Sequence, residues 1–140
     1  MIRGVGHDLV EIVRIMDILG RRAGAKFLSR VLTPAELDFA CSAFGRDMNR
    51  RWAEFAAGRF AAKEAAAKAL GCGIGAAAGF QDLCILPDEA GRPLCRLSDG
   101  AAARLGLDPE HTVIHVSITH TRELASAVAI VETAQAYGRM

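Results

Sequence analysis

The hydrophobic and polar positions of this chain follow a helical period in the first half and a strand-like period towards the end. Apolar residues three to four positions apart predict a helix after a short N-terminal strand over Met1–Gly6. Thr33, followed by a proline and by Glu36 at the third helical position, predicts a second helix that runs to about Ala43. An alanine-dominated stretch predicts the longest helix, from about Arg50 to Leu70, before a glycine stop.

Strand patterns dominate the second part of the chain. A Pro/Asp/Gly turn between two apolar runs predicts a hairpin, and two runs rich in Val and Ile predict further strands. The predicted strands are Asp82–Leu86, Pro93–Leu97, Thr112–Thr119 and Leu124–Val131, with a short helix over Ala101–Leu105. In the third strand, alternation puts His115, Ser117 and Thr119 on one face, which is either a solvent-facing side or a functional surface.

One glutamate and three cationic residues interrupt the alanines of the long helix. Glu64 and Lys68 lie one turn apart, Phe60 lies one turn before Glu64, and Arg59 and Lys63 share the adjoining stripe. An exposed helical ion pair contributes only about 0.3 kcal/mol. The alternative is that Glu64 binds a divalent cation while the cationic side chains hold phosphate oxygens. That alternative requires a second acid, because Mg²⁺ is typically held by one or two carboxylates together with substrate phosphates.

Asp8 follows the predicted N-terminal strand and precedes a helical pattern of apolar residues. This position predicts an N-cap of the next helix, and the carboxylate has a second oxygen that can bind a metal ion. His7 beside it is a ligand, a base or, as with most single histidines, neither. The glycine-rich stretch Cys72–Gly79 has the wrong spacing for a dinucleotide-binding loop and follows a helix instead of a strand, so we reject a Rossmann interpretation.

Composition and charge narrow the class of protein. The 140 residues, 51% of them hydrophobic, suffice for one domain with a core, and no internal repeat or linker divides them. A basic, amphipathic stretch indicates an acidic partner, for which nucleic acid is the generic candidate and an acidic protein surface fits equally well. Its cationic residues are Arg14, Arg21, Arg22, Lys26 and Arg30.

The four cysteines form no C-x-x-C pair and have no metal-type spacing, which predicts a reducing compartment. No apolar run approaches the roughly 18 residues of a membrane-spanning helix, and no signal peptide opens the chain. We therefore expect a cytoplasmic protein without a membrane partner.

Three motifs in this order resemble the holo-acyl-carrier-protein synthases, the short, single-domain type of 4′-phosphopantetheinyl transferase. They are GVGHDLVEIVRI at Gly4–Ile15, GRFAAKEA at Gly58–Ala65 with KALG at Lys68–Gly71, and VSITHT at Val116–Thr121. Shorter family-like sequences lie between them: LTPAEL at Leu32–Leu37, FQD at Phe80–Asp82 and GRP at Gly91–Pro93. The resemblance covers residues 1–132, which leaves 133–140 as a C-terminal tail.

The resemblance implies an α+β fold, in which an antiparallel sheet packs against the long helix, and a homotrimer with active sites at its interfaces. Such enzymes move the 4′-phosphopantetheine arm of coenzyme A to a serine of apo acyl carrier protein in fatty acid biosynthesis, leaving adenosine 3′,5′-bisphosphate. The resemblance implies that Asp8 and Glu64 hold Mg²⁺ on the coenzyme A pyrophosphate and that Lys68 contacts this pyrophosphate. The other implied site residues are Arg59 and Lys63 along the nucleotide, and Ser117 and His120 in the strand wall of the site.

The family also uses its first helix to meet an acidic carrier protein, which makes Arg14 and Arg21, with Arg22 beside them, the expected contacts and argues against a nucleic acid partner. A base must take the serine proton, and the candidates are Glu64 and a water molecule on the magnesium ion. His7 departs from the small or aliphatic residue that is common in the family.

Two other classes of function remain open at the level of sequence. One is another magnesium-dependent enzyme that uses the same acid pair on nucleotides or phosphate esters. The other is a non-catalytic module whose basic helix docks an acidic protein. Release of free phosphopantetheine without a carrier favours the former, and carrier binding without metal dependence favours the latter.

Overall fold

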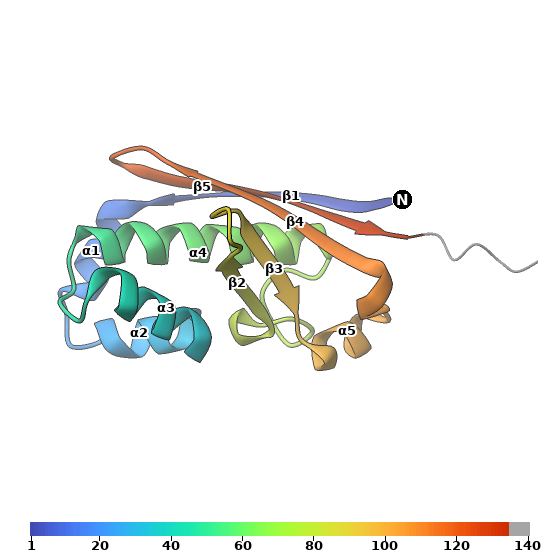
Figure 1. Cartoon of the computed structure of the whole chain (residues 1–140), viewed down its shortest axis with the longest axis horizontal. Coiled ribbons are helices and arrows are strands. Elements are labelled where there is room, and N and C mark those ends of the chain that lie inside the picture. Colours follow the sequence, from blue (N-terminus) through green and yellow to red (C-terminus); the bar gives the residue numbers. More distant parts are fainter. Residues whose placement is uncertain (135–140) are drawn as a thin grey trace, which may run out of the picture.

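A computed structural model describes residues 1–134, in which an antiparallel sheet has helices on one side (Figure 1). The five strands occur in the order β1-β5-β4-β3-β2. They are β1 Ile2–Glu11, β2 Leu83–Pro87, β3 Pro93–Leu97, β4 Thr112–His120 and β5 Leu124–Thr133. The helices are α1 Ile12–Leu19, α2 Gly24–Val31, α3 Pro34–Phe44, α4 Arg50–Ala69 and α5 Asp99–Leu105, with short 3₁₀ turns η1 Phe80–Asp82 and η2 Pro109–His111. The predicted α+β class is confirmed.

Helix α4 lies close against the sheet because small residues meet at the contact. Ala61 and Ala65 are fully buried on α4. A Cβ on Gly6 of β1 would collide with the carbonyl oxygen of Ala65, and a Cβ on Gly4 would collide with that of Ala69. The side chains that flank this contact on β1 and α4 therefore lie near one another. Neither α4 nor any other helix within residues 1–134 has the length and apolar character needed to cross a bilayer.

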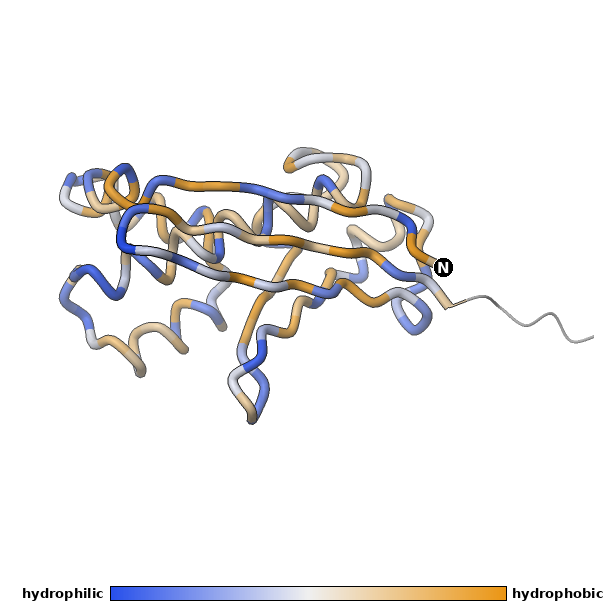
Figure 2. Tube along the Cα trace, turned by 90° about the horizontal axis from the view of Figure 1, so that it is seen from above, coloured by the Kyte–Doolittle hydropathy of each residue, from blue (hydrophilic) through white to orange (hydrophobic). Residues whose placement is uncertain are grey.

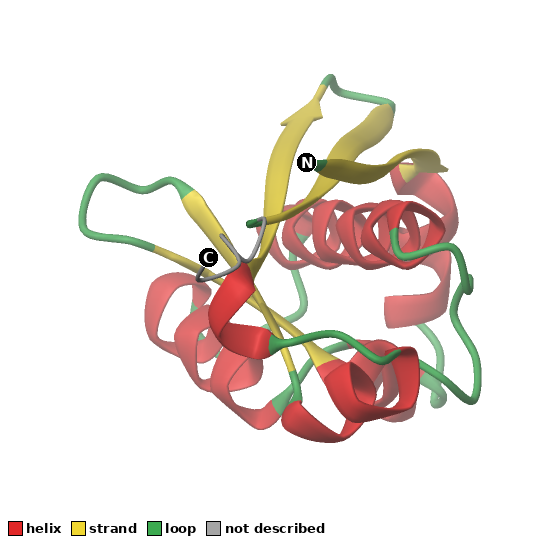
Figure 3. Ribbon diagram, turned by 90° about the vertical axis from the view of Figure 1, so that its right-hand side faces the viewer, coloured by secondary structure: helices red, strands yellow, loops and turns green. Residues whose placement is uncertain are grey.

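Helices α1, α2 and α3 pack together against the half of α4 that carries Trp52 (Figures 1 and 3). Trp52 is buried in this core, and its indole Nε1 donates to the carbonyl oxygen of Gly45 at 2.9 Å. The predicted start of α3 is confirmed. The Thr33 hydroxyl accepts from the Glu36 amide at 3.2 Å, and the Glu36 carboxylate accepts from the Thr33 amide at 2.7 Å.

The β2–β3 hairpin stands apart from the layer formed by β1, β5 and β4 (Figures 2 and 3). Within the described residues, β3 joins β4 through a single register pair, Cys95 opposite Ile114. Figure 2 shows that the projecting tip of the hairpin is largely hydrophilic. This tip is held by Asp88, whose carboxylate accepts from the backbone amides of Ala90 and Arg92 at 2.9 and 2.8 Å.

Strand β1 is longer than the sequence predicts. It continues through Glu11 and pairs Asp8 with Ala127 of β5, so Asp8 does not lie at a strand end. Helix α1 begins at Ile12, and no side chain caps its first turn. The interpretation of Asp8 as an N-cap is therefore wrong. Pairing with β5, a distant segment, keeps these residues extended.

The opposite end of β5 also extends beyond expectation. The strand runs to Thr133, whose amide donates to the carbonyl oxygen of Met1 at 2.9 Å, and the amide of Ala134 donates to that of His111 at 2.8 Å. The C-terminal tail predicted from residue 133 thus begins inside a paired strand. The rest of that predicted tail, 135–140, lies outside the described residues.

Candidate active site

Asp8 and Glu64 lie where β1 crosses α4. Because successive strand residues point to opposite faces, Asp8 shares with Gly6 the face turned towards α4. Lys68, one turn beyond Glu64, donates to Asp8 Oδ1 at 3.2 Å and to the carbonyl oxygen of His7 at 3.0 Å. The fold therefore brings together the three residues expected to serve the metal ion and the pyrophosphate.

The electrostatics of Glu64 reflect the proximity of Asp8. Partial burial raises the pKa of Glu64, repulsion from the Asp8 carboxylate raises this pKa further, and the Lys68 ammonium opposes the rise. Each additional positive charge near the pair favours its ionised form. The pair is therefore electrostatically suited to a cation.

The donor set fits a hard divalent cation with an incomplete protein shell. Asp8 and Glu64 line a hollow of about 420 Å³ that also contains Glu11, Arg14 and part of α1; we call it the acidic hollow. Within residues 1–134, no group of three or more His, Cys, Asp or Glu side chains has the arrangement of a metal site. Two carboxylates leave most coordination positions for substrate oxygens and water, which is how Mg²⁺ usually binds together with phosphates.

Glu64 also lines a second hollow of about 330 Å³, which shares Phe27 and Phe60 with the acidic hollow. Its other walls are apolar except for Arg30, and Phe80 is the largest of them. The ring centroids of Phe27 and Phe60 lie 6.4 Å apart, and those of Phe60 and Phe80 lie 5.3 Å apart. We call this space the aromatic hollow. Glu64 thus adjoins one hollow with a charged rim and one with aromatic walls.

Arg59 and His120 line a different hollow, of about 280 Å³, together with Arg51 and Phe55. The guanidinium carbon of Arg59 lies 4.5 Å from the centre of the Phe55 ring, and its Nε donates to the carbonyl oxygen of Ile85 at 3.0 Å. This hollow shares no lining residue with the acidic hollow. One chain therefore does not bring Arg59 and His120 to the acid pair.

Ser117 lies on the outer face of the sheet, because its neighbours Val116 and Ile118 pack against the core on the α4 side. His7 also lies on the outer face, where its Nε2 is 2.9 Å from the Ser126 hydroxyl of β5. Neither Ser117 nor His7 shares a face with Asp8, although His7 is adjacent to Asp8 in sequence. The side chain of His7 is therefore not a ligand at the acid pair of its own chain.

Lys63 is not at the site. Its side chain is fully buried, and its ammonium donates to Glu36 at 2.6 Å and to the carbonyl oxygens of Val31 and Phe80 at 2.7 and 3.0 Å. These contacts use all three of its protons. The structure therefore contradicts the expectation that Lys63 lies along the nucleotide. Helical spacing puts Lys63 on the same stripe of α4 as Arg59, but α2, α3 and η1 cover the part of this stripe that carries Lys63.

The residues expected to meet a carrier protein lie on and after α1. Arg14 lines the acidic hollow, and Arg21 and Arg22 are exposed in the turn before α2. Val13 and Met16 of α1 are also exposed, at 57% and 38%. The surface of α1 and of the turn after it thus offers positive charge together with apolar contacts.

Sequence reasoning missed several residues around the site, including Arg51, Phe27 and Gln81. The Gln81 amide donates to three backbone carbonyl oxygens between Ser29 and Leu32, at 3.0, 3.2 and 2.9 Å, and so ties η1 to the end of α2. The available signal was the FQD sequence at 80–82, which resembled the family but had no role assigned to it.

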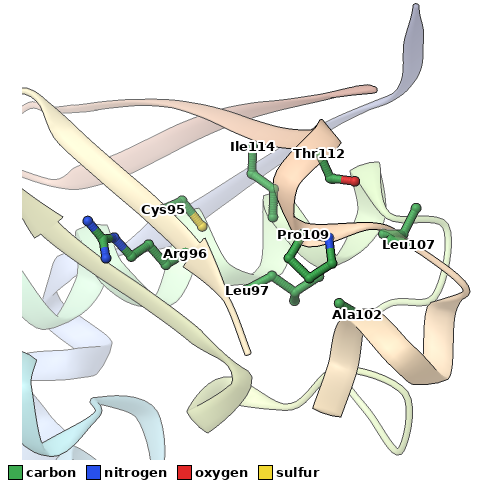
Figure 4. Close-up of a pocket in the computed structure, with 8 residues that line it drawn as sticks. All are labelled: Cys95, Arg96, Leu97, Ala102, Leu107, Pro109, Thr112 and Ile114. Carbon is green, nitrogen blue, oxygen red and sulfur yellow. The ribbon is translucent and has the colours of Figure 1, made fainter. Parts of the chain in front are cut away.

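Another hollow, of about 240 Å³, lies between β3, α5 and β4 (Figure 4). It contains no predicted site residue, and no carboxylate lines it. Burial raises the pKa of Cys95 to about 12, which keeps this thiol protonated and unreactive. Thr112 Oγ1 is buried there without a hydrogen-bond partner among the described residues. The acidic hollow remains the site with groups for phosphoryl chemistry.

The sheet-and-helix fold, with an acid pair at one hollow and a lysine bonded to one of the two acids, agrees with one class of enzyme. Residues 4–129 match the 4′-phosphopantetheinyl transferase superfamily, and the chain belongs to this family. The family resemblance inferred from the three motifs is thereby confirmed.

Within this family, similar proteins are named holo-[acyl-carrier-protein] synthase. The protein of that name from Geobacillus kaustophilus is 46% identical over 132 residues, which cover 94% of this chain and 90% of the relative. A crystal structure of the Bacillus anthracis synthase in complex with CoA (3′,5′-ADP) has a TM-score of 0.77 at 36% identity, covering 96% of this chain and 99% of that one. The Helicobacter pylori synthase in complex with coenzyme A has a TM-score of 0.75 at 33% identity, covering 91% and 99%.

Proposed function

We propose that this chain transfers the 4′-phosphopantetheine group of coenzyme A to a serine of apo acyl carrier protein, for fatty acid biosynthesis, and releases adenosine 3′,5′-bisphosphate. The observation that carries the proposal is that Asp8 and Glu64 line one hollow and that Lys68 donates to Asp8, in a chain of this family. Coenzyme A in the structures of the relatives from B. anthracis and H. pylori supports it as the donor.

The transfer makes one phosphorus–oxygen bond and breaks another. The serine oxygen bonds to the phosphorus that carries the pantetheine arm, and the bond from this phosphorus to the bridging pyrophosphate oxygen breaks. Negative charge develops on the leaving bisphosphate, and the Lys68 ammonium is placed to stabilise it. We assign acceptance of the serine proton to a carboxylate oxygen of Glu64, because its raised pKa makes it a better base than an ordinary glutamate.

We propose Mg²⁺ as the cofactor, held by Asp8 and Glu64. When bound, the ion supplies Lewis-acid stabilisation of the phosphate oxygens. The two carboxylates provide hard oxygen donors, and their mutual repulsion favours a cation beside them.

We propose a homotrimer with active sites formed between subunits. Arg59 and His120 line a hollow that shares no residue with the acidic hollow of Asp8 and Glu64, so a nucleotide that meets all four residues would span two chains. The outer face of the sheet carries exposed apolar side chains suited to contact with another copy. They are Val5, Leu9, Val113 and Val128, exposed at 62%, 55%, 52% and 40%. Ser117 lies on the same face and would reach the site through such a contact.

We propose that α1 and the turn after it bind the carrier protein. Arg14, Arg21 and Arg22 supply positive charge for an acidic partner, and Val13 and Met16 supply apolar contacts. All four cysteines are free, which supports a reducing, cytoplasmic location.

The proposal is tested by intact-protein mass spectrometry of apo acyl carrier protein incubated with the chain, coenzyme A and Mg²⁺. We expect the carrier to gain the mass of one phosphopantetheine arm and an equal amount of adenosine 3′,5′-bisphosphate to appear. Bisphosphate release without any gain on the carrier would instead indicate hydrolysis and contradict the transferase assignment.

A further inference from the structure

Lys63 precedes Glu64 in α4, yet it points into the interior and contacts three separate segments. Its ammonium reaches Glu36 of α3, the carbonyl oxygen of Val31 at the end of α2, and that of Phe80 in η1. The side chains of Lys63 and Glu36 are both 0% exposed. Burial lowers the pKa of Lys63, and the Glu36 carboxylate opposes this effect.

Glu36 extends the same network to the sheet. One carboxylate oxygen accepts from Lys63 and from the Thr33 amide, and the other accepts from the Ile85 amide of β2 at 2.8 Å. The buried pair therefore fixes α3, α4 and β2 relative to the end of α2 and to η1. Every contact is a hydrogen bond with a defined direction.

Two of the three acceptors of Lys63 belong to the aromatic hollow. Val31 and Phe80 line this hollow, and the Phe80 ring packs at a tilt against Phe60, which in turn stacks on Phe27. Gln81 makes a parallel set of bonds from η1 to the end of α2. The position of the aromatic walls relative to α4 thus depends on hydrogen bonds from the residue that precedes Glu64.

A buried ion pair is a poor source of stability, because apolar residues of similar volume often stabilise as well or better. Apolar replacements, however, cannot direct hydrogen bonds to two backbone carbonyls. The apolar walls of the hollow suit an uncharged ligand part with methyl groups and amides. The pantetheine arm, which is attached to the reacting phosphorus, has this chemistry.

We infer that Lys63, paired with Glu36, is a positioning residue that holds the aromatic hollow in place to receive the pantetheine arm of coenzyme A. This inference rests on the proposed function. Lys63 thereby affects the binding of coenzyme A through its pantetheine arm, without contacting the nucleotide part.

The test compares binding of coenzyme A with binding of adenosine 3′,5′-bisphosphate, which lacks the arm. The variant is the double substitution Glu36→Gln with Lys63→Met, which removes both charges and keeps unbranched side chains of similar size. The control is Val131→Ala in β5, a buried core position that lines neither hollow. Calorimetric titrations are made with Mg²⁺ present, at a temperature well below the midpoint of thermal unfolding of each protein.

For the double variant we expect the dissociation constant of coenzyme A to rise about tenfold, below the roughly 100-fold effect that a misplacement of about 1 Å can cause. Binding of the bisphosphate stays within about twofold of the wild type, because the Lys68 side of the site is intact. The kcat/KM for coenzyme A falls by the same factor as its affinity. In the control, the thermal midpoint falls while both affinities stay unchanged.

Equal losses for both ligands, or unchanged coenzyme A binding, would overturn the inference, as would the same selective loss in Val131→Ala. If the double variant does not fold, Lys63→Arg keeps the buried charge but misplaces its donors, and the same selective loss is expected at smaller size. A wild-type chain that transfers nothing to a carrier would refute the proposed function instead, so the two failures are distinguishable.

Discussion

At the scale of single residues, the proximity of the Asp8 and Glu64 carboxylates sets the electrostatics of the proposed site. The pKa of Glu64 is raised by burial and by Asp8, and it is held back by Lys68. Removing the charge of Asp8 and removing that of Lys68 therefore shift the pKa of Glu64 in opposite directions. A third residue, His7, is excluded from this interaction because it points to the other face of β1.

We predict that Asp8→Asn lowers the pKa of Glu64 and that Lys68→Met raises it. Removing a like charge favours the ionised carboxylate, and removing an opposite charge disfavours it. The measurement is an NMR titration of the Glu64 side-chain carboxyl carbon in metal-free protein. An unchanged Glu64 titration in Asp8→Asn would contradict the proximity of the two groups.

The same pKa gives the sign of the pH dependence. If ionised Glu64 accepts the serine proton, activity is lost as the pH falls through its folded pKa. This pKa is raised in the metal-free chain, and a bound Mg²⁺ would favour the ionised carboxylate, so the acid limb of kcat/KM for coenzyme A moves to lower pH as the Mg²⁺ concentration is raised. Profiles of kcat/KM against pH at several Mg²⁺ concentrations check this. An acid limb that does not move with the Mg²⁺ concentration would argue against Glu64 as the titrating base.

At the scale of elements, the contact between β1 and α4 places Asp8 beside Glu64. We predict that Gly6→Ala destabilises the fold by at least about 2 kcal/mol, because the added methyl group meets the backbone of Ala65, which cannot move aside without displacing α4. Urea denaturation measures the loss. Gly75→Ala is the control, since a Cβ there meets open space. Equal, small effects of the two substitutions would show that the contact is loose.

Helix α1 and the turn after it carry exposed positive charge, which salt screens. We predict that raising the ionic strength from about 0.05 to about 0.3 M increases the KM for carrier protein more than the KM for coenzyme A, because the carrier contact is exposed. Steady-state kinetics at several salt concentrations measure both values. Equal responses of the two KM values would argue against docking at Arg14 and Arg21.

Local sequence signals predicted most elements but not the full extent of β1. The capping box of Thr33 and the alanines of α4 act within a few residues, so their helices could be predicted. Asp8 remains in a strand because it pairs with Ala127 of β5. This pairing joins segments far apart in the sequence, so no local pattern predicts it. Lys63 was misplaced for a related reason: the helical period shows which residues share a stripe, but Glu36, which buries Lys63, comes from another element.

At the scale of the whole molecule, the proposed site combines residues that line separate hollows in a single chain. We predict that two inactive variants, Asp8→Ala and Arg59→Ala, regain activity when unfolded, mixed and refolded together. In randomly mixed trimers, about a quarter of the interfaces combine an intact Asp8 with an intact Arg59 from another chain. The assay measures transfer to the carrier protein, and each variant refolded alone is the control. No recovery in the mixture would contradict sites shared between subunits.

We propose that the acid pair Asp8 and Glu64 makes this chain a metal-dependent phosphopantetheinyl transferase. The most direct measurement is the mass of apo acyl carrier protein after incubation with coenzyme A and the wild-type chain, Asp8→Ala or Glu64→Ala, each with Mg²⁺ or with a chelator. The account predicts the gain of one phosphopantetheine arm with the wild type and Mg²⁺, and none in the other reactions. A gain of similar rate in either variant, or in the wild type with chelator, would contradict it.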